Sequence, residues 1–125
     1  MINHVSIGVS DIARAKSFYD AALKPLGYSC LSVAETSLGY GKDAVALSLS
    51  LTKSPVAEDP ASGLHFCFDG PTRKSVEAFY NAALTSGGRD NGKPGLRADY
   101  GDNYYAAFVI DPDGYRIEAY CGRPA

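Results

Sequence analysis

The sequence has few of the residues that build disulfide frameworks or structural zinc sites. Its three cysteines, Cys30, Cys67 and Cys121, are far apart, and none forms a Cys-x-x-Cys pair. An odd number of isolated cysteines indicates reduced thiols in a core or on a strand. A structural zinc site is therefore not expected.

Long apolar runs and an excess of positive charge are also missing. Asp11, Arg14 and Lys16 interrupt the first segment before a signal peptide or a membrane span could develop. The formal net charge is -2, and the 12 lysines and arginines are scattered rather than arranged in a stripe. We expect a cytoplasmic protein with neither a membrane nor a nucleic acid as its partner.

The length and hydrophobic content indicate one domain over residues 1–125. A chain of 125 residues that is 46% hydrophobic can bury a core of its own but has no room for two. Residues 52–63 are rich in proline, serine, glycine and charge, which is typical of a connecting loop. The loop is too short for a disordered interdomain tether.

The segments before and after this loop repeat one pattern at a constant offset of 61 positions. The matching residues are His4 and His65, Asp11 and Thr72, Phe18-Tyr19 and Phe79-Tyr80, Ala21-Ala22-Leu23 and Ala82-Ala83-Leu84, and Gly27 and Gly88. An ungapped offset of this kind is typical of a duplicated unit. We predict internal repeats at about 1–55 and 60–122.

Each repeat is predicted to begin with a strand and a helix. Residues 3–9 alternate polar and apolar side chains, with His4 and Ser6 on the less apolar face. Apolar residues then recur at helical spacing from 12 to 26, between Asp11 as an N-cap and Gly27. Further strands are predicted at 30–34, 36–40, 44–51, 104–110 and 115–120, while residues 87–101 have no clear assignment.

Glu118 is the carboxylate that most needs an explanation. Asp111-Pro112-Asp113-Gly114 has the composition of a tight turn, and residues 115–120 then re-enter a sheet. Alternation places Arg116, Glu118 and Tyr120 on one face of that strand, away from its apolar side. A carboxylate in such a position is either exposed to solvent or part of a site.

The two histidines favour a site. His4 and His65 are the only histidines, and they occupy equivalent points of the two first strands, on the face opposite the helices. Two imidazoles and one carboxylate on one sheet face are a suitable ligand set for Zn, Mn, Fe, Co or Ni, with positions left open for substrate or water. The alternative for each histidine is a structural or surface role.

With this set of residues the chain resembles the vicinal oxygen chelate superfamily. This superfamily includes glyoxalase I, fosfomycin-resistance thiol transferases, extradiol dioxygenases and bleomycin-resistance proteins. The resemblance covers nearly the whole chain. It is carried by residues 3–11, Ser17-Phe18-Tyr19, Leu64-His65-Phe66, and residues 108–118 with their Asp-Pro-Asp-Gly turn.

The resemblance implies an α+β fold in which two βαβββ modules form an open, barrel-like cleft that holds a divalent metal. His4, His65 and Glu118 match three of the family's ligand positions, and Glu118 is the expected catalytic carboxylate. The fourth position, a Glu or Gln in glyoxalase I, falls on Leu47, or on Ser48 with a one-residue slip. Because neither is a good ligand, a three-ligand site like those of the fosfomycin and extradiol members fits better.

The resemblance leaves the reaction open. Extradiol enzymes also use a second-shell histidine, and this chain has no third histidine. Ser6 stands where the fosfomycin-resistance proteins carry a small hydroxyl residue, but residues 101–103 do not look like their cation-binding loop. We expect a lyase, isomerase or transferase that acts on a small oxygen-chelating substrate, and the alternative is a metal-free protein that sequesters a planar compound, as bleomycin-resistance proteins do.

Candidate substrate-binding residues cluster around the glycine-rich segment. Its glycines would allow the backbone to approach a ligand, although a mobile surface loop is the alternative. Arg97 and the aromatic side chains have the chemistry to bind an anionic or aromatic substrate. The candidates are Ser6, Arg97, Tyr100, Tyr104, Tyr105 and Tyr120. Family members of this length commonly pair their modules across chains, so we expect a homodimer in which His4 of one chain joins His65 and Glu118 of the other.

Overall fold

The computed structural model describes residues 1–125, and its elements follow the order of the repeat. The first half contains β1 (Val5–Val9), α1 (Ile12–Leu23), the 3-10 turn η1 (Lys24–Leu26), β2 (Ser29–Ala34), β3 (Ser37–Gly41) and β4 (Val45–Leu51). The second half contains β5 (Phe66–Asp69), α2 (Arg73–Thr85), β6 (Arg89–Leu96), β7 (Tyr105–Ile110) and β8 (Arg116–Cys121). The prediction of an α+β fold with two βαβββ modules is confirmed.

Each module forms its own four-stranded sheet. The strand orders are β1-β4-β3-β2 and β5-β8-β7-β6, so the same topology occurs twice. In both sheets the first strand runs parallel to the last, and the remaining pairs are antiparallel. The two sheets stay separate and do not close into a barrel.

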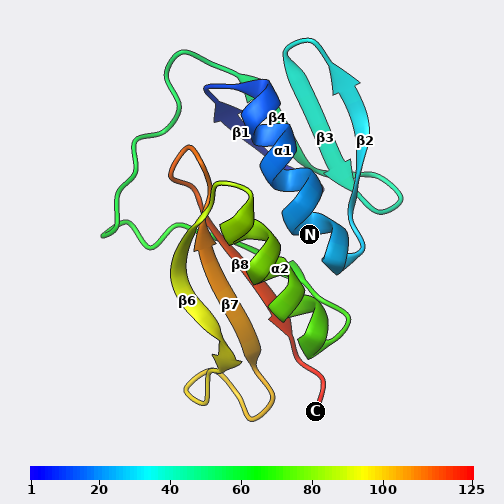
Figure 1. The fold of residues 1–125 in the computed structure, drawn as a ribbon, viewed down its shortest axis with the longest axis vertical. Coiled ribbons are helices and arrows are strands. Elements are labelled where there is room, and N and C mark those ends of the chain that lie inside the picture. Colours follow the sequence, from blue (N-terminus) through cyan, green and yellow to red (C-terminus); the bar gives the residue numbers. More distant parts are fainter.

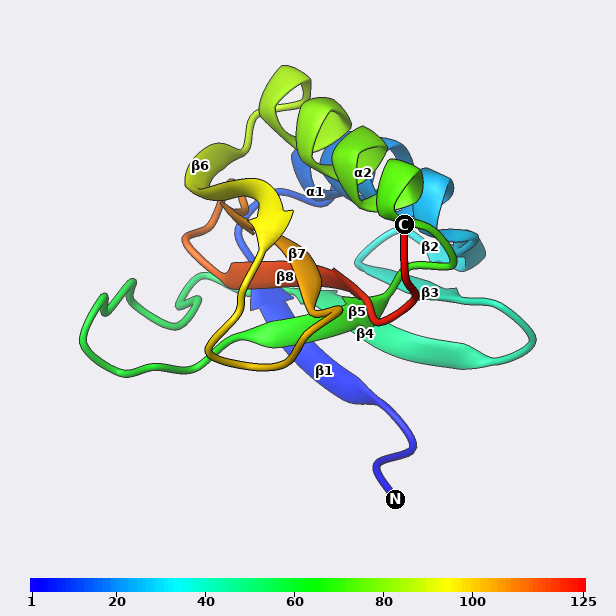
Figure 2. The ribbon, with the colours of Figure 1, turned by 90° about the horizontal axis from the view of Figure 1, so that it is seen from below.

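Both helices pack on the same side of the molecule. Figure 1 shows α1 and α2 side by side, and Figure 2 shows both of them above the two sheets, with no helix below. We call the helix-packed side of each sheet the covered face; in the second sheet it carries Tyr105, Ala107, Val109, Ile117 and Ala119. The other side is the open face, and in the second sheet it carries Cys67, Phe108, Glu118 and Tyr120. Neither helix is long and apolar enough to cross a membrane.

The helix boundaries follow from local capping. The Asp11 carboxylate accepts a hydrogen bond from the backbone N–H of Arg14 at 3.0 Å, as the predicted N-cap should. Thr72 and Ser75 form a reciprocal capping box at the start of α2. After α1 and η1, Gly27 takes φ +91°, a conformation that favours glycine and ends the helical segment.

The segment without a sequence assignment contains β6. Four glycines and a proline lie within residues 87–95, which gives a composition that normally argues against a strand. Its pairing with β7 shifts register twice, between Asp90 and Gly92 and between Gly92 and Gly95. The strand forms because β7 offers it an edge, and this long-range pairing leaves no local pattern in the sequence.

One hydrophobic core of 22 buried residues joins the two modules. Phe18 and Ala22 of α1 belong to it, as do Phe79 and Ala83 of α2, and the two helices pack against each other. At roughly 1.5–3 kcal/mol for each large apolar side chain removed from water, this shared core is the main force that holds the modules together.

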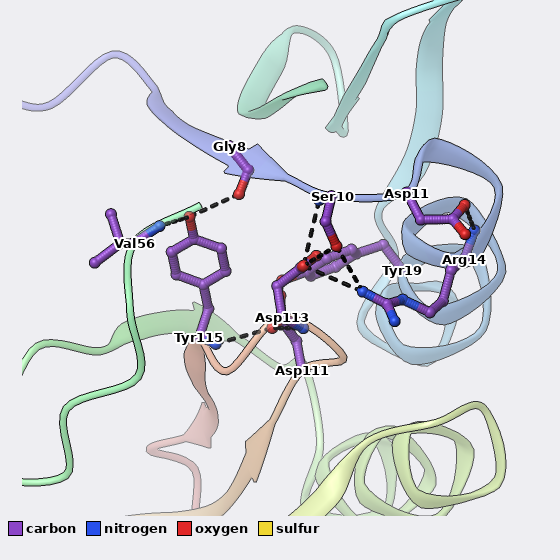
Figure 3. A network of polar contacts seen from close by, with 9 residues as sticks. All are labelled: Gly8, Ser10, Asp11, Arg14, Tyr19, Val56, Asp111, Asp113 and Tyr115. Atoms are coloured by element: carbon purple, nitrogen blue, oxygen red, sulfur yellow. Dashed lines mark hydrogen bonds and ion pairs between the residues drawn. The ribbon is translucent and has the colours of Figure 1, made fainter. Parts of the chain in front are cut away.

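The turn at residues 111–114 adds a polar link between the modules (Figure 3). Asp111 is buried, and its carboxylate accepts hydrogen bonds from the hydroxyl of Tyr19 at 2.5 Å and from the backbone N–H groups of Asp113 and Tyr115. Asp113 in turn accepts from the hydroxyl of Ser10 at 2.5 Å and pairs with Arg14 at 3.2 Å. The turn of the second module is thus tied to helix α1 of the first.

Candidate metal and substrate site

Glu118 lies in the middle of the open face of the second sheet. Alternation along β8 turns Arg116, Glu118 and Tyr120 toward this face, because the residues between them belong to the core. Cys67 of β5 and Phe108 of β7 are the cross-strand partners of Glu118. Only 2% of Glu118 is exposed, so its carboxylate requires polar partners.

Two side chains contact the oxygens of Glu118. Nε2 of His65, just ahead of β5, lies 2.9 Å from Oε1, and the hydroxyl of Tyr104, just ahead of β7, donates to Oε2 at 2.6 Å. Burial, followed by the hydrogen bond to Glu118 and its charge, raises the pKa of Tyr104 above the ordinary value. The phenol therefore remains a hydrogen-bond donor at neutral pH.

The ring of His65 faces an oxygen atom at each nitrogen. Nδ1 lies 3.2 Å from the carbonyl oxygen of Gly63, and Nε2 lies 2.9 Å from Glu118. A neutral imidazole carries only one N–H, so both contacts are satisfied only when a second proton, or a cation in its place, lies between Nε2 and the carboxylate. With the N–H at Nδ1, the lone pair of Nε2 and an oxygen of Glu118 are two donor atoms suited to a divalent metal.

His4 does not join this pair within one chain. Its Nδ1 contacts the side-chain oxygen of Asn3 at 2.8 Å, and the residue is exposed ahead of β1. His4 and His65 line one groove of about 540 Å³ between the sheets, yet no three His, Cys, Asp or Glu side chains converge. The structure brings two of the three predicted ligands together and leaves the third apart.

Strand pairing identifies the residue of the first module that corresponds to Glu118. Ser6 pairs with Ser48, and its repeat equivalent Cys67 pairs with Glu118. Ser48 therefore occupies the fourth-ligand position, whereas Leu47 is buried in the core. Ser6 is exposed on the open face of the first sheet and does not line the hollow beside Glu118.

That hollow has an aromatic wall. Its volume is about 610 Å³, and its lining residues are His65, Asp99, Tyr100, Tyr104, Phe108 and Glu118. The ring of Tyr104 stands edge-on to Tyr100, with centroids 5.1 Å apart, and packs on Tyr120 at 4.3 Å. Three of the four predicted tyrosines thus form one row of rings, which suits a flat or apolar ligand.

The structure places Tyr105 away from the site. Its hydroxyl donates to Glu77 of α2 at 2.6 Å, and Arg73 lies over its ring at 5.2 Å. The prediction treated Tyr104-Tyr105 as a pair, but adjacent residues of a strand point to opposite faces. Tyr105 therefore belongs to the helix-packed side and is not a site residue.

Phe108 and Cys67 lie at the site although neither was predicted to be a site residue. The ring of Phe108 is 6.1 Å from that of His65. Burial, followed by the charge of Glu118, raises the pKa of Cys67 to about 12, so its thiol stays protonated at neutral pH. The signal that could have found them is the alternation of a strand, in which residues two apart share a face. Phe108 lies two such steps after Tyr104, and Cys67 lies one step after His65.

Arg97 directly follows β6 and lies on the same open face. Its guanidinium carbon is 5.3 Å from the centre of the Phe108 ring. Phe108 therefore lies between Arg97 on one side and His65 with Glu118 on the other.

The comparison with protein families agrees with this architecture. A model of the Glyoxalase/Bleomycin resistance protein/Dioxygenase superfamily matches residues 1–119. The chain belongs to this superfamily. Within the superfamily, the chain is similar to a glyoxalase/bleomycin resistance protein from Albidiferax ferrireducens T118, with 29% identity, 97% of each chain covered and a TM-score of 0.81.

Two further similar proteins extend the comparison. The uncharacterized protein YqjT of Bacillus subtilis (strain 168) is 26% identical over 122 residues, which is 94% of this chain and 95% of the relative. The fosfomycin resistance protein FosX from Listeria monocytogenes is 11% identical, with a TM-score of 0.73 over 98% of this chain and 93% of that one. At this identity the similarity to FosX concerns the fold alone.

Proposed function

We propose that the protein is a cytoplasmic, divalent-metal-dependent enzyme that acts on a small oxygen-chelating substrate, with a lyase, isomerase or transferase type of reaction. The observation that carries the proposal is the contact between His65 and the buried carboxylate of Glu118. It pairs an imidazole nitrogen with a carboxylate oxygen at 2.9 Å, on the wall of a hollow large enough for a small molecule.

The third ligand would come from a second copy of the chain. His4 is exposed and has no partner beyond its neighbour Asn3, while the His65–Glu118 pair has an open side. A homodimer in which the partner subunit's His4 completes each site fits both features. Zn, Mn, Fe, Co or Ni would accept such a set of two imidazoles and one carboxylate.

The side chains of the site have separable tasks. When bound, the metal would supply Lewis-acid stabilisation of an enolate or alkoxide. Tyr104 holds Oε2 of Glu118 and thereby fixes the orientation of the carboxylate. Glu118 is the buried carboxylate on this face and the expected catalytic residue, while Tyr100 and Phe108 line the hollow beside it.

Metal analysis of single variants tests the proposal. We expect near-stoichiometric divalent metal in the purified parent protein and loss of metal in His4→Ala, His65→Ala and Glu118→Gln. Loss of one ligand of three should weaken binding by more than the roughly 10- to 100-fold that is typical of an outer-shell change. A parent that binds none of the five metals would refute the proposal.

A mixed dimer tests whether the site is shared. His4→Ala and Glu118→Gln chains, each metal-free alone, are refolded together. If the site spans two chains, each mixed dimer regains one intact site of two, whereas a site within one chain stays broken in both subunits. Light scattering on the same samples gives the oligomeric state.

A second function is favoured by a different observation, the row of Tyr100, Tyr104 and Tyr120. A metal-free dimer could sequester a planar compound against these rings, which is the role that the resemblance to bleomycin-resistance proteins implies. Binding of an aromatic probe that is equal in parent, His65→Ala and chelator-treated protein would favour this role over catalysis.

A further inference from the structure

The guanidinium of Arg97 is held in a fixed place by backbone groups. Nη1 donates to the carbonyl of Gly95 at 2.9 Å, and Nη2 donates to the carbonyl of Lys93 at 2.7 Å. The ring of Phe108 supports the group from one side at 5.3 Å. A guanidinium has five N–H donors, so further donors remain for another partner.

Two glycines of β6 make room for this group. A Cβ on Gly92 would lie 3.3 Å from Nη2 of Arg97 and 3.0 Å from Cδ2 of Phe108. A Cβ on Gly95 would lie 3.3 Å from Nη1. The two glycines within β6 are therefore explained in part by the space that the guanidinium occupies above the strand.

No carboxylate neutralises Arg97. The ion pairs of the structure are Arg14 with Asp113, Lys16 with Asp20, His65 with Glu118, and Arg89 with Glu58. An arginine that is oriented by backbone carbonyls and packed on a ring, but left without a counter-ion, is suited to bind a carboxylate or a phosphorus oxyanion through paired hydrogen bonds.

The strand register places this cation at a defined distance from the proposed metal ligands. Gly92 pairs with Phe108, and Phe108 pairs with Glu118, so the three lie in one row across the open face. With neighbouring strands about 4.8 Å apart, the guanidinium above Gly92 is about 10 Å from Glu118. The ring of Phe108 fills the interval.

We propose that Arg97 binds an anionic group of the substrate, at the far end of a molecule whose chelating oxygens lie at His65 and Glu118. The inference rests on the proposed function for the chelating end only. The interval corresponds to about one aromatic ring, so the substrate class is a small acid with vicinal oxygens and an oxyanion on opposite ends of a ring or short chain. Tyr100, Tyr104 and Phe108, which line the hollow, then contact its apolar middle.

Two matched probes test the assignment: 3,4-dihydroxybenzoate and its uncharged analogue 3,4-dihydroxybenzamide. Titrations are carried out without oxygen, so that neither probe is oxidised. We expect the parent to bind the acid roughly tenfold or more tightly than the amide, because a charge-assisted pair is worth about 1.5–3 kcal/mol. Arg97→Gln should abolish this preference by weakening binding of the acid far more than binding of the amide, and Arg97→Lys should retain part of it.

Two further variants separate recognition from a purely structural role. Gly95→Ala keeps Arg97 but its Cβ would push the guanidinium by a few tenths of an ångström, so it should weaken the preference for the acid, with circular dichroism and unfolding midpoint close to those of the parent. Arg89→Gln removes an arginine from the same strand that is already paired with Glu58 and should change nothing. The proposal would be overturned if the parent bound the acid and the amide with equal affinity. It would also be overturned if Arg97→Gln kept the parent's preference for the acid.

Chelator treatment distinguishes this inference from the proposed function. Removal of the metal should weaken the binding of both probes by the same factor. The ratio of their affinities should be preserved, because the chelator does not remove Arg97. If the chelator affects neither probe while the ratio still depends on Arg97, metal dependence fails and anion recognition stands.

Discussion

Tyr104 is the residue whose hydrogen bond most directly shapes the candidate site. Tyr104→Phe removes the donor at 2.6 Å from Oε2 of Glu118 and keeps the ring in its row. We expect metal affinity to fall by about 10- to 100-fold, the usual effect of losing an outer-shell partner. Competition with a chromophoric chelator measures the affinity. Tyr105→Phe, which removes a hydroxyl on the opposite face, is the control and should leave it unchanged.

The phenols give a prediction for alkaline pH. Burial raises the pKa of Tyr19 well above its ordinary value, and burial with the hydrogen bond to Asp20 raises that of Tyr40. A raised pKa in the folded state means that stability is complete below pH 10 and is lost as the pH rises above it. Absorbance at 295 nm should therefore show fewer phenolates at pH 11 in the native protein than in urea. Equal absorbance in both states would contradict this.

Single residues also show how far sequence reasoning reaches. The pairing of His65 with Glu118 was predictable because alternation and the repeat fix which face a side chain occupies. The division of the ligands between two chains, with His4 apart from the other two, was expected only from the family resemblance, because it depends on how the sheets are placed and no local pattern encodes that. Tyr105 was misplaced for a simpler reason: its neighbour Tyr104 took the site-facing position.

Among the elements, the turn at residues 111–114 has a role beyond chain reversal. Its buried Asp111 accepts a hydrogen bond from the hydroxyl of Tyr19, which lies on helix α1 of the other module. Tyr19→Phe should lower the free energy of unfolding by about 1–3 kcal/mol, because the carboxylate loses a buried partner. Urea titration measures the change. The hydroxyl of Tyr105 bonds the exposed Glu77, so Tyr105→Phe should lower the free energy of unfolding distinctly less.

The predictability of the elements depended on how local their signals are. Helix α1 begins after its predicted cap Asp11, Thr72 caps α2 as the repeat implied, and most strands were predicted within one or two residues. Strand β6 was not, because its glycines serve the Arg97 guanidinium and its pairing shifts register twice. A strand whose sequence is adapted to a neighbour across the sheet carries little information about its own conformation.

For the whole molecule, the shared core predicts cooperative unfolding. The 22 residues of the core come from both modules, and the helices of the two modules pack on each other. Neither module can lose its structure without exposing apolar surface of the other. Differential scanning calorimetry should show one transition, with equal calorimetric and van't Hoff enthalpies. Two resolved transitions would mean that the modules are thermodynamically independent.

The position of β2 at the rim of the first sheet has a practical consequence for handling the protein. Its outer edge is unpaired, and Leu31 and Val33 are 43% and 64% exposed. Apolar edges of this kind template strand-to-strand association into aggregates. Val33→Lys should therefore slow the growth of turbidity in concentrated stocks while metal content stays at the parental level, and equal turbidity in both proteins would place the weak point elsewhere.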